Sequence, residues 1–308
     1  MEAVKTYELT IIGGGPAGLT AAIYSGRALV NAVLLERGLP GGQAATSHMI
    51  ANYPGFPGGI GGPELAQKME EHAREFGVEV LMAEVSSVAQ GEGWYLIKTS
   101  DGVIKSKALL VATGSRQKRL GVPEEDELRG KGLSYCATCD GAFFQDRDVV
   151  VVGGGDSAVE EAGYLTRFVS RVYLVHRRDQ LRAAKSLVER ARQNPKIYMV
   201  LDSVVTGLKG KDRLEGVEVT NVKTHETRTI AASGIFVYVG LEPNTEFIRG
   251  VVDMDQQGYI ITTQDMETSA PGVFAAGDVR SKSLRQVATA VGDGALAAVQ
   301  AGRFLEGH

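Results

Sequence analysis

The residues of this chain with the clearest chemistry are two cysteines, Cys136 and Cys139, the only cysteines among its 308 residues. Two thiols at this spacing can form a reversible disulfide or supply two ligands to a metal ion. As a structural staple the pair would close a very short loop, worth only about 2 kcal/mol. A structural zinc site normally has four ligands, and the five histidines show no H-x-x-x-H spacing or comparable pairing. The pattern therefore favours a redox-active pair in a reducing compartment and predicts no metal site.

A dinucleotide-binding element is predicted near the start of the chain. An apolar run leads into Gly13-x-Gly15-x-x-Gly18, and the next apolar run, 32–35, ends at Glu36. In a strand–turn–helix unit such glycines allow a tight turn and close approach of the backbone to a pyrophosphate, and the acid binds a ribose hydroxyl. We prefer this interpretation to an ordinary glycine-rich turn because the strand, the helix and the terminal acid are all present.

The same pattern recurs in the middle of the chain. Four consecutive valines lead into Gly153-x-Gly155-x-x-Ala158, followed by a helical stretch and a second apolar strand, 172–175. Guanidinium groups suit a 2′-phosphate, so the basic run that ends this strand predicts NADP(H) and not NAD(H). The alternative is a solvated basic turn. The basic run consists of His176, Arg177 and Arg178.

The repetition predicts an α/β fold of two Rossmann-like, three-layer domains, each with an antiparallel β meander, over 78–104 and 197–230. The C-terminal strand and helix lack a third fingerprint, so we expect them to complete the first domain. That domain would then be discontinuous, 1–117 and 245–308, with 118–244 inserted as the domain that carries the C-x-x-C pair. We expect the inserted domain to turn about joints near Gln117 and Glu242.

Composition excludes several classes of protein. The net charge of −4 predicts no basic surface for nucleic acid, and 44% apolar with 23% charged residues is typical of a globular protein. No apolar stretch approaches the length of a membrane span, and the N-terminal residues lack the order of a signal peptide. We therefore expect a cytoplasmic protein that binds neither nucleic acid nor membrane.

Taken together, the motifs resemble those of the bacterial-type, low-molecular-weight thioredoxin reductases, which are NADPH-dependent FAD flavoproteins. The resemblance covers essentially the whole chain, and its most specific element is the Cys-Ala-Thr-Cys-Asp-Gly unit at 136–141. The other matching segments are 13–18, 41–43, 52–55, 112–114, 153–158, 176–179 with 182–183, 277–278 and 285–286.

The resemblance implies a thioredoxin reductase that works as a homodimer. Electrons would pass from NADPH via FAD and the Cys136/Cys139 disulfide to thioredoxin or a thioredoxin-like protein. A flavin is a natural relay because it accepts a hydride and passes an electron pair to sulfur. Cys139 would lie nearest the flavin and Asp140 would act as general acid/base. For Asp140 a helix N-cap remains the alternative from the residues alone.

The resemblance also implies two sets of cofactor-binding residues. The FAD set is Gly13, Gly15, Pro16, Ala17, Gly18, Glu36, Arg37, Gly41, Gly42, Gln43, Asn52, Ala112, Gly114, Gly277, Asp278, Arg285, Gln286 and Val287. The NADPH set is Gly153, Gly154, Gly155, Asp156, Ser157, Ala158, His176, Arg177, Arg178 and Arg182. Glu160 and Glu161 are interpreted as solvated helix residues without a role.

Three other functions compete with this one. An NADPH:ferredoxin flavoprotein of the same fold would need no cysteines. A dithiol oxidase that discharges to oxygen would not need the basic run. A nucleotide-sensing protein without turnover would leave the cysteine pair idle.

Overall fold

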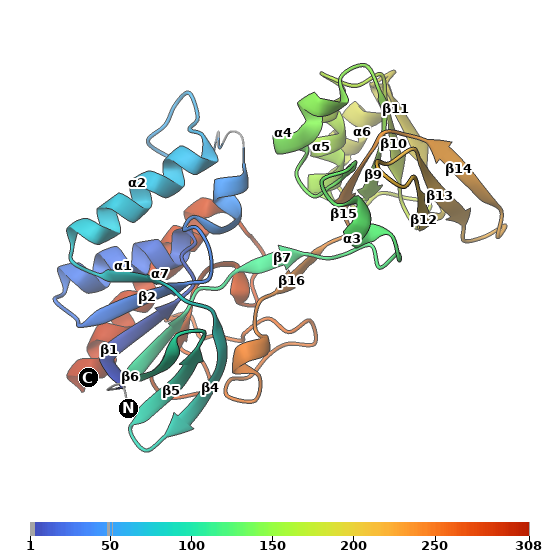
Figure 1. The fold of residues 1–308 in the computed structure, drawn as a ribbon. Coiled ribbons are helices and arrows are strands. Elements are labelled where there is room, and N and C mark those ends of the chain that lie inside the picture. Colours follow the sequence, from blue (N-terminus) through green and yellow to red (C-terminus); the bar gives the residue numbers. More distant parts are fainter. Residues whose placement is uncertain (1–3, 48–49, 51, 308) are drawn as a thin grey trace. The chain divides into compact units, whose positions relative to one another are not determined.

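The computed structural model describes residues 4–47, 50 and 52–307, except for the side chains of Thr138 and Cys139. The chain divides into two compact units, drawn in Figure 1. Unit 1 comprises residues 1–116 and 242–308, and unit 2 comprises 117–241. Unit 2 is therefore an insertion in unit 1.

Unit 1 is built on a largely parallel sheet in the order β3-β2-β1-β6, with β5 and β4 continuing it in antiparallel fashion. β17 pairs in parallel with the last part of β6, while β5 pairs with its first part, so the two share one edge of β6. The strands are β1 (Lys5–Ile12), β2 (Ala32–Glu36), β3 (Glu79–Met82), β4 (Val85–Gly91), β5 (Trp94–Thr99), β6 (Gly102–Val111) and β17 (Val273–Ala275).

Helices α1 (Pro16–Arg27) and α7 (Val287–Glu306) cover one face of this sheet (Figure 1). Small residues let them approach closely: a Cβ at Gly294 would lie 2.1 Å from the Ala17 carbonyl oxygen. The other face packs on the β4–β5 meander and on the segment 247–279. Both faces are thus buried, as expected of a parallel sheet. The remaining helices of the unit are α2 (Gly62–Glu75), η1 (Gly42–Thr46), η3 (Glu246–Ile248) and η4 (Gly277–Val279).

Unit 2 repeats the arrangement with an all-parallel sheet in the order β11-β10-β9-β15-β8. Helices α4, α5 and α6 pack on one face, and the separate antiparallel sheet β12-β13-β14 packs on the other. The strands are β8 (Leu133–Ser134), β9 (Asp148–Gly153), β10 (Arg171–Val175), β11 (Ile197–Val200), β12 (Ser203–Lys209), β13 (Gly216–Asn221), β14 (Thr227–Ala231) and β15 (Gly234–Tyr238). The helices are α3 (Glu125–Leu128), α4 (Ala137–Asp140), η2 (Gly141–Phe144), α5 (Asp156–Leu165) and α6 (Lys185–Gln193).

The predicted meanders over 78–104 and 197–230 are wrong in their first strand. β3 pairs in parallel with β2, and β11 pairs in parallel with β10, so each extends the Rossmann sheet. Each of these strands follows a helix, α2 or α6, and such a crossover returns the chain parallel to the strand before it. A short apolar run carries no signal of which partner it will choose.

The two joints between the units run alongside each other. β7 (Ser115–Gln117) and β16 (Leu241–Pro243) pair in a two-stranded ribbon. Arg116 forms ion pairs with Glu242 at 3.1 Å and with Glu246 at 2.5 Å. Among the described residues, no helix combines the length and the apolar character needed to cross a membrane.

Candidate active site

The first fingerprint forms a tight β1–turn–α1 unit in unit 1. Gly13 has φ +106°, and a Cβ there would lie 2.5 Å from the carbonyl oxygen of Ala112. A Cβ at Gly18 would lie 1.8 Å from the Gly13 carbonyl oxygen, so the helix can approach the strand only with glycine here. Gly15 is the N-cap of α1 and precedes Pro16. Strand and helix are therefore packed tightly at this turn. The free N–H groups in the first turn of α1 point away from the packed side, as the binding of a phosphate requires.

Glu36 ends β2 beside this turn. Its Oε2 accepts a hydrogen bond from the Gly14 N–H at 2.6 Å, and its Oε1 accepts one from the Gly38 N–H at 3.0 Å. These two bonds hold the carboxylate at the glycine turn. The following residue, Arg37, is exposed.

The segment 41–43 returns the chain to the same turn. The Gly41 N–H donates to the Gly14 carbonyl oxygen at 2.7 Å, and Gly41 has φ +117°. Gly42 lies against Gly15, since a Cβ on Gly42 would be 3.2 Å from the Gly15 Cα. The Gln43 side-chain amide donates to the Ser115 carbonyl oxygen.

The C-terminal residues of the FAD set approach from η4 and the start of α7. A Cβ at Gly277 would lie 2.9 Å from the Ala17 Cβ, so η4 lies against α1. The Asn52 Nδ2–H donates to Gln286 Oε1 at 3.0 Å, and Gln286 caps α7 together with Thr289. Of the other predicted residues, Ala112 directly follows β6, Gly114 precedes β7, and Val287 is the first residue of α7.

Two charged side chains in this region, those of Asp278 and Arg285, are partly buried. Burial raises the pKa of Asp278, and the positive charge of Lys282, whose Nζ lies 3.3 Å from Asp278 Oδ1, opposes that rise. The Arg285 guanidinium lies 4.2 Å from the centroid of the Tyr259 ring, and its Nε is buried without a hydrogen-bond partner among the described residues. A buried donor without a partner is costly, which fits a position completed by a ligand.

The second fingerprint, in unit 2, is packed in the same way. Gly153 has φ +154°, and a Cβ there would lie 2.5 Å from the Tyr238 carbonyl oxygen and 2.6 Å from the Ala158 Cβ. Gly155 is the N-cap of α5, and a Cβ on it would meet nothing within 4 Å. Ser157 in the first turn is exposed. The N-terminus of α5 is thus open to a phosphate.

The loop after β10 is fastened to this fingerprint. The Gly154 carbonyl oxygen accepts hydrogen bonds from the N–H groups of Arg182, at 2.6 Å, and Ala183, at 3.1 Å. Asp156 Oδ1 accepts one from the Ala184 N–H at 2.7 Å. A Cβ at Gly154 would lie 2.3 Å from His176 Nδ1, so the imidazole fills the space that a side chain would take.

The positive charge of the basic run comes from its arginines. Burial, followed by the charge of Arg182, lowers the pKa of His176, which is 5% exposed, so the imidazole is neutral at physiological pH. Arg177 and Arg178 are exposed directly after it. They lie on the loop that is hydrogen-bonded to the glycine turn, where their guanidinium groups could bind a 2′-phosphate.

The cysteine pair begins just after β8. Cys136 is disulfide-bonded, and the side chain of Cys139 lies outside the described residues. The Cys136 N–H donates to Ser134 Oγ at 3.0 Å, and the Ser134 hydroxyl donates to Asp140 Oδ2 at 2.6 Å. Asp140 occupies the N-cap position of η2 but makes no side-chain capping bond there, so the structure gives its carboxylate no capping role. A hydroxyl therefore links the backbone at Cys136 to the carboxylate that follows the pair.

A family model for the pyridine nucleotide-disulphide oxidoreductases matches residues 7–294. The chain belongs to this family. Two relatives of this oxidoreductase are thioredoxin reductases: that of Peptoclostridium acidaminophilum is 46% identical over 99% of this chain and 98% of its own, and that of Bacillus subtilis is 44% identical over 99% and 97%. The crystal structure of Lactococcus lactis thioredoxin reductase, 46% identical, matches 98% of this chain and 100% of its own with a TM-score of 0.89.

One residue near the cysteine pair of this oxidoreductase was missed from sequence. Glu161 on α5 is half-buried, not solvated as predicted, and its Oε2 has no hydrogen-bond partner among the described residues. Burial, with the neighbouring Glu160 carboxylate, raises the pKa of Glu161 to about 7. The sequence signal for this partial burial is the spacing of Glu161, which lies between the buried Ala158 and Leu165 on one side of the helix.

Glu161 is close to the backbone of the cysteine turn through a tyrosine. The Ala137 N–H donates to Tyr238 Oη at 2.8 Å. Burial and then the Glu161 carboxylate raise the pKa of Tyr238, so the phenol stays protonated. The partly buried Glu161 thus lies near the neutral phenol of Tyr238, which contacts the short helix α4.

Glu161→Gln is expected to make the free energy of unfolding less dependent on pH. Because the folded-state pKa of Glu161 is raised from 4.5 to about 7, its contribution to stability is present at low pH and is lost as pH rises through 7. The variant should exceed wild type by about 3 kcal/mol at pH 8 and by about 1 kcal/mol at pH 5.5. Urea unfolding of both proteins at the two pH values checks this.

The matched control is Glu189→Gln on α6, since Glu189 is exposed and does not contribute to the raised pKa of Glu161. Its difference from wild type should stay nearly constant between the two pH values. An equal pH dependence for Glu161→Gln and Glu189→Gln would contradict the burial argument.

Proposed function

We propose that this chain is an NADPH-dependent thioredoxin-disulfide reductase, a flavoprotein with bound FAD. The observation that carries the proposal is the disulfide-bonded Cys136 in the same unit as the second fingerprint and its exposed arginines. A nucleotide reductant and a reducible disulfide in one oxidoreductase are the two ends of a dithiol reductase reaction. The named relatives, matched over nearly their full lengths, supply the substrate class, thioredoxin.

FAD fits the cradle in unit 1. The open first turn of α1 suits the pyrophosphate, and Glu36, held at the glycine turn, suits the adenosine ribose. The remaining part of FAD would find a hydrogen-bond acceptor in the partly buried carboxylate of Asp278. It would find a donor in the unpartnered Nε of Arg285. When bound, the flavin supplies two-electron chemistry that connects a hydride donor to a disulfide.

NADPH fits the second fingerprint. The α5 N-terminus would bind the pyrophosphate, with Ser157 exposed in its first turn. Arg177 and Arg178 would bind the 2′-phosphate, and Arg182 adds a third exposed guanidinium. The neutral imidazole of His176 packs against the glycine turn and contributes no charge to this site.

In the proposed reaction the protein disulfide takes up two electrons and two protons to give the thiols of Cys136 and Cys139. Thiol–disulfide exchange then breaks the disulfide of thioredoxin, leaves thioredoxin as a dithiol and restores the disulfide of this protein. Asp140 would accept and return one proton, because exchange needs a thiolate and a leaving thiol. The Ser134 hydroxyl, which donates to Asp140 Oδ2, orients that carboxylate.

Each competing function leaves one feature of the structure or sequence without an explanation. An NADPH:ferredoxin flavoprotein has no need of a disulfide-bonded Cys136, and a dithiol oxidase has no need of Arg177 and Arg178 on a loop bonded to the glycine turn. A nucleotide sensor has no need of the cysteine pair. We further propose a cytoplasmic homodimer, on the basis of the same family resemblance.

The proposal is tested by spectroscopy of the purified full chain loaded with FAD. NADPH should bleach the visible flavin absorption under anaerobic conditions, and oxidised thioredoxin should restore it. Oxidised ferredoxin and dioxygen, each added in place of thioredoxin, distinguish the alternatives. Failure of NADPH to bleach the flavin, or recovery with ferredoxin only, would contradict the proposal.

Locking unit 2 against unit 1 is expected to stop steady-state turnover while preserving one half-reaction. The NADPH fingerprint and the cysteine pair both lie in unit 2, whereas the proposed FAD cradle lies in unit 1. We expect unit 2 to turn about the β7–β16 ribbon so that the two groups are presented alternately. A non-reducible cross-link between the units, followed by rapid-mixing measurement of each half-reaction, checks this. A cross-linked protein that cycles at the native rate would overturn the expectation.

A further inference from the structure

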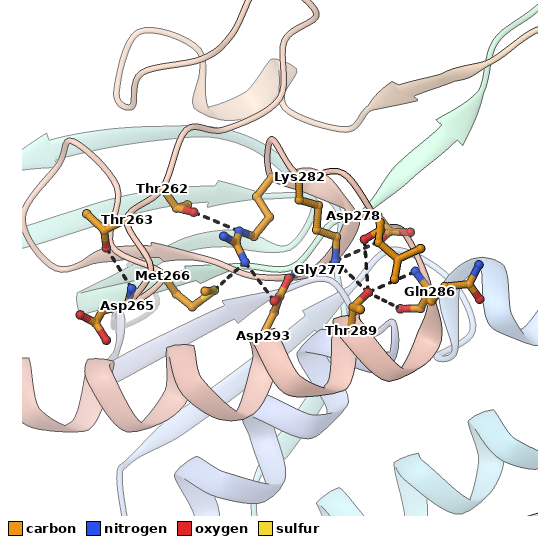
Figure 2. A network of polar contacts seen from close by, with 12 residues as sticks. Thr262, Thr263, Asp265, Met266, Gly277, Asp278, Lys282, Gln286, Thr289 and Asp293 are labelled. Atoms are coloured by element: carbon orange, nitrogen blue, oxygen red, sulfur yellow. Dashed lines mark hydrogen bonds and ion pairs between the residues drawn. The ribbon is translucent and has the colours of Figure 1, made fainter. Parts of the chain in front are cut away.

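Lys282 joins two acidic side chains that belong to different elements of unit 1. Its Nζ lies 3.3 Å from Asp278 Oδ1, which follows β17, and 3.1 Å from Asp293 Oδ2 on α7 (Figure 2). The Lys282 side chain is only 11% exposed. Surface ion pairs contribute little, but the ammonium group of this bridge and the Asp293 carboxylate, which is 14% exposed, are screened less by solvent.

Asp293 is itself held by other donors. The Arg280 Nη1 lies 2.9 Å from Asp293 Oδ1, and the Gly277 N–H donates to Asp293 Oδ2 at 3.1 Å. Arg280 is in turn fixed by donating through Nε to Thr262 Oγ1 at 3.0 Å. Asp293 is therefore a rigid anchor, and Lys282 extends from it to Asp278.

The bridge also balances charge. Two carboxylates and two cations make up the cluster, and other charges near Asp278 come from Arg285 and, if ionised, from Tyr259. Burial raises the pKa of Asp278 and the Asp293 carboxylate adds to that rise, whereas Lys282 and Arg285 lower it. Removing Lys282 would leave two carboxylates facing each other with one fewer cation between them.

We infer that Lys282, anchored by Asp293, is a positioning residue that keeps Asp278 ionised and oriented as an acceptor for the hydroxyl groups of FAD. This inference rests on the proposed FAD site. A carboxylate binds a hydroxyl group more strongly than a neutral acid does, so the affinity for FAD depends on the charge that Lys282 preserves.

Lys282→Met is expected to weaken FAD binding by about 10-fold or more near pH 7.5, the loss that accompanies a weakened hydrogen bond to a charged group. It should also raise the pH below which FAD affinity falls. Asp293→Asn is expected to move that pH in the opposite direction, because it removes the neighbouring carboxylate and leaves Lys282 to Asp278 alone. A loss of packing alone would not give shifts of opposite sign.

The experiment titrates FAD into the apo form of the full chain and follows quenching of flavin fluorescence from pH 5 to pH 9. Lys68→Met, which removes an exposed partner of Glu64 on α2, is the matched control and should bind as wild type does. Circular dichroism of each apo protein confirms folding. If Lys282→Met does not fold, Lys282→Gln, which removes the same charge, takes its place in the titration.

The outcomes separate the two claims. Wild-type protein that binds no FAD contradicts the proposed function. Wild-type protein that binds FAD, with pH profiles unchanged in both variants or displaced in the same direction, overturns the role of Lys282.

Discussion

Replacing either Cys136 or Cys139 by serine is expected to abolish thioredoxin reduction while FAD stays bound. A disulfide needs both sulfurs, and a serine hydroxyl cannot take part in thiol–disulfide exchange. The cysteine pair lies in unit 2, whereas the proposed FAD cradle is built from unit 1, so neither substitution removes a residue of that cradle. Steady-state assays with oxidised thioredoxin should give only background rates for both variants.

The same variants should still oxidise NADPH with an artificial acceptor at a rate close to that of wild type. That reaction needs the two nucleotide sites and not the dithiol. Thr224→Ser, at an exposed turn of unit 2, is the control and should retain both activities. Thioredoxin turnover above a trace in either cysteine variant would mean that the dithiol is not an obligatory carrier.

The sequence could predict the two nucleotide cradles because their steric requirements are local. Gly13, Gly18 and Gly153 stand where a Cβ would overlap a backbone atom at 1.8–2.5 Å, and no other residue type meets that condition. Spacing within one strand–turn–helix unit expresses such a requirement directly. The predicted parallel sheets follow from the same units.

Pairing between distant segments could not be predicted in this way. Alternation along a short run does not specify a partner, so the sequence predicts β3 and β11 as meander strands, whereas their parallel pairing depends on the helices that precede them. The partial burial of Glu161 arises from packing around α5. The expectation that charged residues are solvated fails for a charged residue that lies on the buried side of a helix.

The charge bridge at η4 is a third case. The family resemblance implies a role for Asp278, but nothing in the order of residues indicates that Lys282 connects it to Asp293, since the link depends on how α7 packs against η4. The converse holds for His176. The sequence predicts it as part of a basic run with the arginines, yet burial lowers the pKa of His176 and leaves it a neutral packing group against Gly154.

Specificity for NADPH over NADH is expected to depend on the two exposed arginines after β10. Arg177→Ala and Arg178→Ala should each weaken NADPH binding by about 1–3 kcal/mol, the range for hydrogen bonds to a charged group, with NADH affected little because it has no 2′-phosphate. The double variant should lose most of the preference. Binding constants for both nucleotides, measured on the FAD-loaded protein, check this.

Arg228→Ala on β14 removes another exposed arginine of unit 2 and should change neither binding constant. The loop itself should stay in place, because its hydrogen bonds to Gly154 come from the backbone N–H groups of Arg182 and Ala183 and not from the arginine side chains. The prediction therefore isolates the guanidinium charge from the fold of the loop. Equal losses for NADPH and NADH would instead mean that Arg177 and Arg178 support the loop, as in the alternative of a solvated basic turn, and that the 2′-phosphate is recognised elsewhere.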